Sequence, residues 1–197
     1  MPTTARLMLG AMVVATDGLC GLVKSLLVDP SVPRVVHLVV EPEHRIGLGR
    51  LVPMELVCAI EEDADNGIDI DCNRGDFEAL PPAETSEVVR GAGAGYSYVR
   101  NPPRLTREVH DSLPRGEIPV RSGGPVLATD GQIGMVAGFD TALPQYRITQ
   151  LLVNEHQFPW RHRTVALPMS CVTGFNAGVE ISLTVDEAAK IASVPRS

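Results

Sequence analysis

The stretch that decides the fold is Ala15-Thr16-Asp17-Gly18-Leu19-Cys20-Gly21, because the same phrase returns as Ala128-Thr129-Asp130-Gly131-Gln132-Ile133-Gly134. The two copies lie 113 residues apart, and shorter phrases that follow each copy also match. For example, Leu51-Val52-Pro53 in the first copy corresponds to Ala166-Leu167-Pro168 in the second. Repetition at a fixed spacing is typical of a repeated structural unit. The sequence therefore predicts an internal duplication.

Each copy is predicted to begin with a β-hairpin, because its Asp-Gly pair lies between two apolar runs. A tight turn of this kind needs a positive φ at its centre, and glycine adopts that conformation without steric cost. Another glycine follows 3 residues later, at a place where a strand interior should carry a side chain, which predicts a bulge or a bend. The residues interpreted as structural for the turn and the bend are Asp17, Gly18, Gly21, Asp130, Gly131 and Gly134.

Both copies resemble the PRC-barrel family, which is named for the cytoplasmic domain of the photosynthetic reaction-centre H subunit and also occurs in a ribosome maturation factor. In the first copy the resemblance rests on Gly10-x-x-Val13-x-Ala15-x-Asp17-Gly18-x-x-Gly21-x-Val23 and Leu51-Val52-Pro53-x-x-x-Val57. In the second it rests on Gly124-x-Val126-x-Ala128-x-Asp130-Gly131-x-x-Gly134-x-Val136 and Leu167-Pro168-x-x-x-Val172. The resemblance implies an all-β fold with minor α content, made of two small PRC-type β-barrels, each closed by a short C-terminal helix.

The predicted organisation has three parts. Residues 1–80 form the first barrel after a short lead at 1–9, residues 81–123 form a Pro/Gly-rich linker, and residues 124–197 form the second barrel with its C-terminal helix. The linker is expected either to be disordered or to lie along the barrels as a docked arm. Asn73 and Thr184 are the predicted N-caps of the two helices, with Glu187 completing a capping box in the second.

Composition narrows the classes of function. The net charge of −7 is concentrated in the first copy, where residues 10–80 carry 13 acidic and 5 basic side chains. An acidic balance argues against direct nucleic-acid binding, for which a basic face is expected. No apolar run approaches the roughly 18 residues of a membrane-spanning helix, so we expect a cytoplasmic protein with no membrane span.

The sequence offers no motif for catalysis, and we expect no catalytic residues, no cofactor and no bound metal. The four cysteines lack Cys-x-x-Cys pairing and are interpreted as small buried hydrophobic residues. The Gly91-x-Gly93-x-Gly95 run lacks the preceding strand, following helix and lysine of a phosphate-binding loop. We interpret the chain as non-enzymatic.

One connection between two predicted strands has the composition of a contact surface. It carries the only tryptophan beside basic groups, and such aromatic and arginine clusters are enriched in interface hot spots. The candidate protein-binding residues are Phe158, Trp160, Arg161 and Arg163. Alternatively, the aromatic residues fold back onto the linker or form the seam between the two barrels.

The function expected from these observations is a protein-binding adaptor or scaffold, whose partner is another protein of unknown identity; a homo-oligomer is compatible with this role. Two alternatives follow from the resemblance. The first is a ribosome-assembly or RNA-processing accessory that binds a ribosomal protein. The second is an electron-transfer accessory similar to the reaction-centre H subunit.

Overall fold

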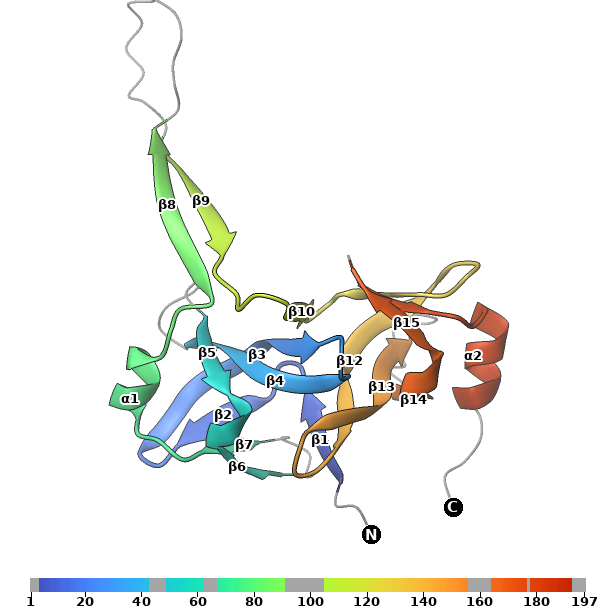
Figure 1. Cartoon of the computed structure of the whole chain (residues 1–197), viewed down its shortest axis with the longest axis horizontal. Helices are drawn as coiled ribbons and strands as arrows, with labels where there is room; N and C mark the ends of the chain where they lie inside the picture. The colour runs from blue at the N-terminus through green and yellow to red at the C-terminus, as the bar shows by residue number, and fades with distance from the viewer. Residues whose placement is uncertain are drawn as a thin grey trace, which may run out of the picture.

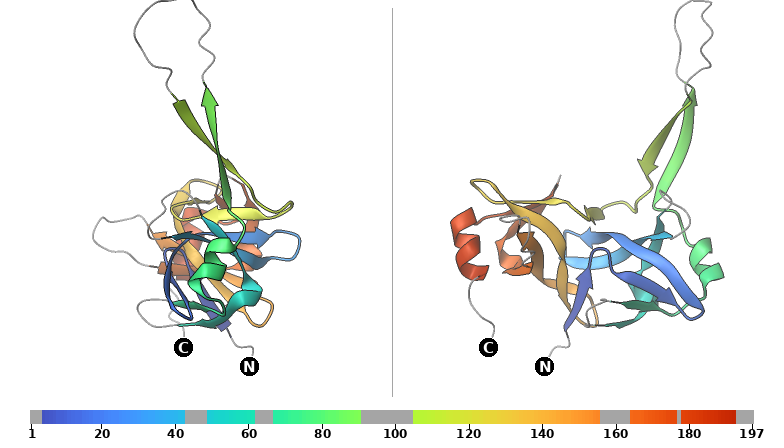
Figure 2. Two further views of the ribbon diagram at one scale, coloured as in Figure 1. Left: turned by 90° about the vertical axis from the view of Figure 1, so that its left-hand side faces the viewer. Right: turned by 180° about the vertical axis from the view of Figure 1, so that it is seen from behind.

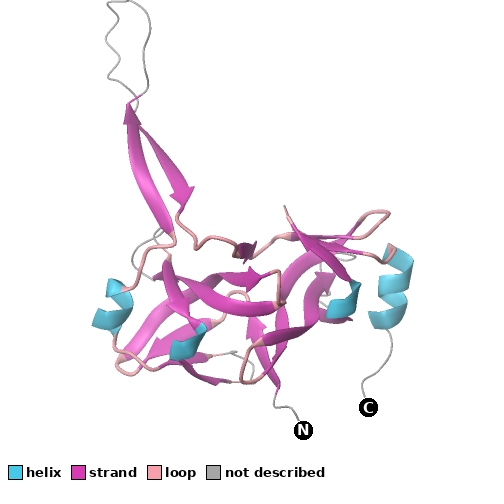
Figure 3. Cartoon of the chain, viewed as in Figure 1, coloured by secondary structure: helices cyan, strands magenta, loops and turns pink. Residues whose placement is uncertain are grey.

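The computed structural model describes residues 4–42, 49–61, 67–90, 105–155, 164–176 and 178–192, with backbone alone at 85–90, 105–111 and 192. Strands dominate this part of the chain, and helices are few and short (Figure 3). The prediction of a mostly β chain with minor helix is therefore confirmed.

The first half of the chain forms an antiparallel series of strands followed by a helix. Its elements are β2 (Met12–Ala15), β3 (Gly18–Asp29), β4 (Arg34–Pro42), β5 (Arg50–Pro53), a short 3-10 turn (Met54–Leu56), β6 (Val57–Ile60), β7 (Ile68–Ile70) and α1 (Arg74–Ala79). Strands β2 to β5 pair in chain order, and β7 then pairs in parallel with β2 and antiparallel with β6. The last strand of the half thus returns beside its first.

The second half repeats this order. Its elements are β11 (Pro125–Leu127), β12 (Gln132–Ala142), β13 (Arg147–Glu155), β14 (Thr164–Pro168), a second 3-10 turn (Met169–Cys171), β15 (Val172–Phe175), β16 (Val179–Ile181) and α2 (Val185–Ala192). The pairing also repeats, because β11 to β14 pair in chain order and β16 returns in parallel beside β11. Figure 1 shows α1 and α2 at opposite ends of the molecule. Both predicted helices are confirmed.

Two further strands are exchanged between the halves. The strand β1 (Thr4–Met8) precedes the first half but pairs with β12 of the second, whereas β10 (Ile118–Arg121) precedes the second half but pairs with β3 of the first. The registers correspond, since Leu7 faces Phe139 and Val120 faces Leu26, each residue lying 113 positions from its counterpart. The sequence predicts a short lead to the first barrel at residues 1–9, whereas β1 within them pairs with a strand of the second half.

The two halves share one curled sheet of 14 strands. Within the described residues, the direct junction between β4 and β13 is a single pair, Arg34 at the start of β4 opposite Arg147 at the start of β13. Two reciprocal backbone hydrogen bonds flank this pair, from Val35 N to Tyr146 O at 3.0 Å and from Ile148 N to Pro33 O at 2.9 Å. The halves are therefore joined at this junction and by the exchanged strands. The predicted closure of each half into a barrel of its own remains a prediction.

The main hydrophobic core is one cluster, made mostly of aliphatic side chains from both halves. The exchanged strands contribute to it directly, because Leu7 is fully buried and Val120 is 5% exposed. The aromatic rings of Phe139 and Phe175 meet edge to face with centroids 6.4 Å apart. Burying apolar surface stabilises a fold by about 25 cal/mol per Å². Because Leu7 of β1 is buried against the second half and Val120 of β10 against the first, each exchanged strand adds to the stability of the half that it joins.

A two-stranded arm projects from the first half of the molecule, above β5 in Figure 1. Strands β8 (Glu84–Arg90) and β9 (Leu105–Asp111) form an antiparallel ribbon that projects away from the curled sheet (Figures 1 and 2). At its base, Ala83 and Leu113 pack in a small second cluster with β3, β4 and β5 residues. The linker at 81–123 is expected from its sequence either to be disordered or to lie along the barrels. In its described part, β8 and β9 instead form a ribbon that projects from the body, and β10 lies against the first half by pairing with β3.

Candidate functional site

The duplicated aspartates of the turns are structural residues, and each caps a helix. Asp17 Oδ1 accepts a hydrogen bond of 2.8 Å from the backbone nitrogen of Arg74, the first residue of α1. Asp130 Oδ1 accepts one of 2.9 Å from the backbone nitrogen of Val185, the first residue of α2. The first amides of a helix have no partner within it, so a nearby carboxylate stabilises the helix start.

The turn geometry differs from the predicted one. In the first copy Ala15 pairs with Gly18, so Thr16 and Asp17 form the centre of the turn, and the glycine, at φ +140°, follows it. Among the described non-glycine residues, only Tyr146 has a positive φ, and Gly131 shows none in the second copy. The prediction that glycine occupies the turn centre is wrong. Asp17 lies there instead, and its carboxylate accepts a hydrogen bond from the start of α1.

The predicted bulges are confirmed beside Gly21 and Gly134. The register of β2 with β3 shifts between Val13 and Val14, and that of β11 with β12 shifts at the corresponding place. A methyl group on Gly21 would overlap the carbonyl oxygen of Glu41, and one on Gly134 would overlap that of Asn154. The two glycines allow a neighbouring strand to approach closely where the sheet bends.

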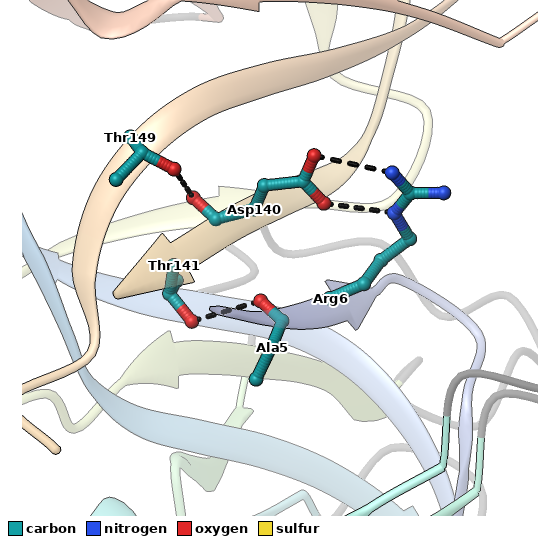
Figure 4. Close-up of polar contacts among 5 residues, drawn as sticks. All are labelled: Ala5, Arg6, Asp140, Thr141 and Thr149. Carbon is teal, nitrogen blue, oxygen red and sulfur yellow. Dashed lines mark hydrogen bonds and ion pairs between the residues drawn. The ribbon is translucent and has the colours of Figure 1, made fainter. Parts of the chain in front are cut away.

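An ion pair fixes the exchanged strand β1 to β12. Arg6 Nε lies 2.8 Å from Asp140 Oδ1, and its Nη2 donates to Oδ2 at 3.1 Å, which makes a two-pronged contact (Figure 4). Thr141 Oγ1 donates to the Ala5 carbonyl at 3.0 Å, and Thr149 Oγ1 donates to the Asp140 carbonyl at 2.9 Å. In the other half the corresponding facing pair is Pro119 with Leu27. The register of β1 with β12 is thus held by an ion pair, whereas the equivalent register of β10 with β3 has an apolar pair at this position.

A surface beside the junction of the halves carries two adjoining hollows, which we call the seam surface. One hollow of about 370 Å³ is lined by Asp29, Pro30, Ser31, Arg34, Val36, Arg115, Gly116 and Glu117. The other, of about 260 Å³, is lined by Arg34, Val35, Val36, Met54, Glu55, Pro144, Gln145 and Tyr146. Arg34 and Val36 belong to both hollows. Sequence reasoning gave no indication of this surface, because the residues come from segments far apart in the chain.

Local contacts set the electrostatics of the seam surface. Hydrogen bonds from the Ser31 hydroxyl and backbone nitrogen lower the pKa of the partly exposed Asp29 carboxyl. Burial raises the pKa of the Tyr146 hydroxyl, which donates to the Val57 carbonyl at 3.5 Å. His37 Nδ1 lies 2.8 Å from Glu117 Oε2 and holds the segment before β10 against β4. The seam surface is therefore a mixture of charged and apolar groups beside the junction of β4 and β13.

The remaining sequence expectations have separate outcomes. Phe158, Trp160, Arg161 and Arg163 lie outside the described residues, so their proposed role stays a prediction. The interpretation of the cysteines as buried holds for Cys20 but is wrong for Cys58, which is exposed.

Among the described residues, no group of three or more His, Cys, Asp or Glu side chains could hold a metal ion. In the same part of the chain, no helix is long and apolar enough to cross a membrane.

Comparison with known proteins adds no identification: no protein-family model matches the sequence, and no curated protein matches it.

Proposed function

We propose that this chain is a non-enzymatic protein-binding adaptor built of two PRC-type barrels, and that it contacts its partner through the arm formed by β8 and β9. The arm is the observation that carries the proposal. Within the described residues, β8 and β9 pair only with each other. An isolated two-stranded ribbon is marginally stable in water, and its outer edges present unpaired backbone groups that can accept another strand. Addition of a strand from a partner would use these groups.

The repeated architecture supports the tandem-barrel part of the proposal. The strand order of one half matches that of the other, and both place a helix after the returning strand. The resemblance to the PRC-barrel family implies a small β-barrel followed by a short helix in each copy, and the repeated order of strands and helix supports this proposal. The body would then serve as a rigid base for the arm.

The use of the acidic side chains supports a non-enzymatic role. Asp17 and Asp130 cap helices, and Asp140 pairs with Arg6. Glu187 closes the capping box of α2 with Thr184. These carboxylates are therefore engaged in holding the fold.

The arm can be tested by removing it. Ser112 N donates to the Ala83 carbonyl at 2.8 Å, so the two ends of the arm are adjacent. Replacement of residues 85–110 by Asn-Gly, which favours a tight hairpin turn, should leave the body folded, as judged by circular dichroism. With the full chain as bait in an affinity pull-down, we expect specific proteins to be captured by the wild type and lost from the armless variant.

Trp160→Ala in the full chain is the companion variant. Loss of the same proteins would place the Trp160 loop on the same binding face, whereas unchanged capture would remove that loop from the proposal. Identical captured proteins with and without the arm would overturn its role. Capture of ribosomal proteins would favour the ribosome-assembly alternative over other adaptor roles.

A further inference from the structure

A third hollow, of about 210 Å³, lies beside the exchanged strand β10, and we call it the β10 hollow. Its described lining comes from β10, from β12 and β15 of the second half, and from the turns before β11 and after β15. The lining residues are Pro119, Val120, Arg121, Gly124, Val136, Phe175, Asn176 and Gly178. Because β10 pairs with the first half and the other elements belong to the second, both halves are needed to build the hollow.

Most of the side chains that line the β10 hollow are apolar. Val120, Val136 and Phe175 are only 5%, 3% and 7% exposed, so their positions are fixed by the packing around them. The Phe175 ring is held edge to face against Phe139. A smaller apolar cavity, of about 150 Å³, can hold a benzene molecule. The β10 hollow therefore has space for a compact apolar group such as an aromatic ring.

The charge of the lining is positive. Among the described residues that line the β10 hollow, Arg121 is the only titratable one, and it is exposed. Arg121 also has an interaction within the protein, but a guanidinium carries five N–H donors and can serve more than one acceptor. Outside the lining, the Glu180 carboxylate accepts a hydrogen bond of 3.1 Å from Asn176 Nδ2. The group that selects the charge of a ligand in the hollow is therefore Arg121.

The first half carries apolar side chains at the corresponding positions of β1 and the turn after it. The counterpart of Arg121, 113 residues earlier, is Met8, which packs against the main core. The counterpart of Gly124 is Ala11, which is 4% exposed and belongs to that core. An apolar side chain and a methyl group in the first half are thus replaced by a charged side chain and a glycine in the second.

The charge at this place also differs between the halves. Glu61 N donates to the Gly67 carbonyl at 2.8 Å, and Asn176 N donates to the Gly178 carbonyl at 3.0 Å, so Asn176 is the counterpart of Glu61. The first half therefore has a methionine and a glutamate where the second has an arginine and an asparagine. This difference favours an anion in the second half and disfavours one in the first.

We infer that the β10 hollow binds a small aromatic carboxylate, with its carboxylate at Arg121 and its ring against Val136 and Phe175. Arginine binds carboxylates through two parallel hydrogen bonds. An aromatic ligand ring also gains edge-to-face or offset contact with the Phe175 ring. This ligand site lies outside the arm and goes beyond the proposed adaptor function, so it holds whether or not the arm binds a partner.

The probe is benzoate, titrated at fixed ionic strength into the purified full chain and followed by the methyl NMR signals of Val120 and Val136. We expect these signals to shift and to saturate, whereas those of the fully buried Val13 in the first half stay unchanged. Benzamide keeps the ring without the charge, and acetate keeps the charge without the ring. Each should bind about tenfold more weakly than benzoate, because each lacks one of the two contacts.

Variants of Arg121 test its role. Arg121→Gln should weaken benzoate binding by about tenfold, because it loses the charge-assisted hydrogen bonds. Arg121→Met introduces the residue that the first half has at this position, and it should abolish binding in a chain that stays folded by circular dichroism. The matched control is Arg74→Gln, which removes an exposed arginine on α1, at the opposite end of the molecule from β15 (Figure 1). This control should bind benzoate as the wild type does.

Four results would overturn the aromatic-carboxylate site: benzoate that leaves the Val120 and Val136 signals unmoved, benzamide that binds as tightly as benzoate, acetate that binds as tightly as benzoate, or unchanged binding by Arg121→Gln. Equal losses in Arg121→Gln and Arg74→Gln would also overturn it, because they would show a response to the net charge of the chain and not to the arginine in the hollow.

Discussion

Asp17 is hydrogen-bonded through its carboxylate to the backbone nitrogen of Arg74, 57 residues later, at 2.8 Å. The aspartate lies in the turn that opens the first half of the chain, and the arginine begins the helix that ends that half. Asp130 and Val185 repeat this relationship at 2.9 Å in the second half. Each half is thus tied from its beginning to its end by one carboxylate.

Removal of either carboxylate should destabilise its helix. We expect Asp17→Ala and Asp130→Ala each to lower the free energy of unfolding by about 1–2 kcal/mol, the usual range for loss of a helix cap. Asp17→Asn should lose less, because its amide oxygen can still accept the hydrogen bond. Urea denaturation measures the effect, with the exposed Asp71→Ala as control. Equal losses for Asp17→Asn and Asp17→Ala would contradict a capping role.

Addition of a methyl group should destabilise the fold strongly at one glycine of the second hairpin and hardly at all at another. Gly134→Ala would force the Asn154 carbonyl away and should cost roughly 3 kcal/mol or more. Gly131→Ala meets only Val185 Cγ2 at 3.7 Å, an ordinary contact, and should change the stability by no more than about 0.5 kcal/mol. Thermal unfolding compares the two variants. A tolerated Gly134→Ala would mean that the strands do not approach so closely.

The Arg6–Asp140 pair should matter through the carboxylate that it neutralises. The Asp140 side chain is 12% exposed, so Arg6→Leu would leave a poorly hydrated charge and should cost about 1–3 kcal/mol. The double variant Arg6→Leu/Asp140→Leu should return to within about 1 kcal/mol of the wild type, because it resembles the apolar Pro119–Leu27 pair. Chemical denaturation tests this. A double variant as unstable as the single one would show that the charges themselves are required.

Acidification should weaken the α2 capping box. Hydrogen bonds from the Thr184 backbone nitrogen and hydroxyl lower the pKa of Glu187 below its unfolded value. Glu187 therefore contributes stability above its unfolded pKa, and this contribution is lost as the pH falls through its folded pKa. Glu187→Gln cannot titrate, so its free energy of unfolding should fall less than that of the wild type between about pH 6 and pH 3. Identical slopes for both proteins would contradict this assignment.

Local features of the fold could be predicted from the sequence because they depend on neighbouring residues. The hairpins, the bulges beside Gly21 and Gly134, and both helices with their caps lie where the residue patterns place them. The helix-capping role of Asp17 and Asp130 was not predicted. The Asp-Gly pair suggests a turn with glycine at its centre, whereas the partner of Asp17 is a helix start 57 residues away.

The exchanged strands were missed because their partners are distant and their own patterns are weak. Strand β10 contains Pro119, which favours a loop, and β1 is only 5 residues long. One signal was present in the repeat itself. The 113-residue spacing extends back to Gly10 and Gly123, so each repeat begins earlier than the turn phrase suggests. The seam surface could not be predicted, because Arg34 and Arg115 share a hollow only after β10 has docked on β3.

The exchange of β1 and β10 also constrains the order of events during translation. Arg6 meets Asp140 only after 134 further residues have been added to the nascent chain. At typical rates of synthesis this takes on the order of ten seconds. For most of that time β10, the strand that pairs with β3, has not been made either. The newborn first half therefore exposes an open strand edge, and the chain reaches its native pairing only when its second half has emerged.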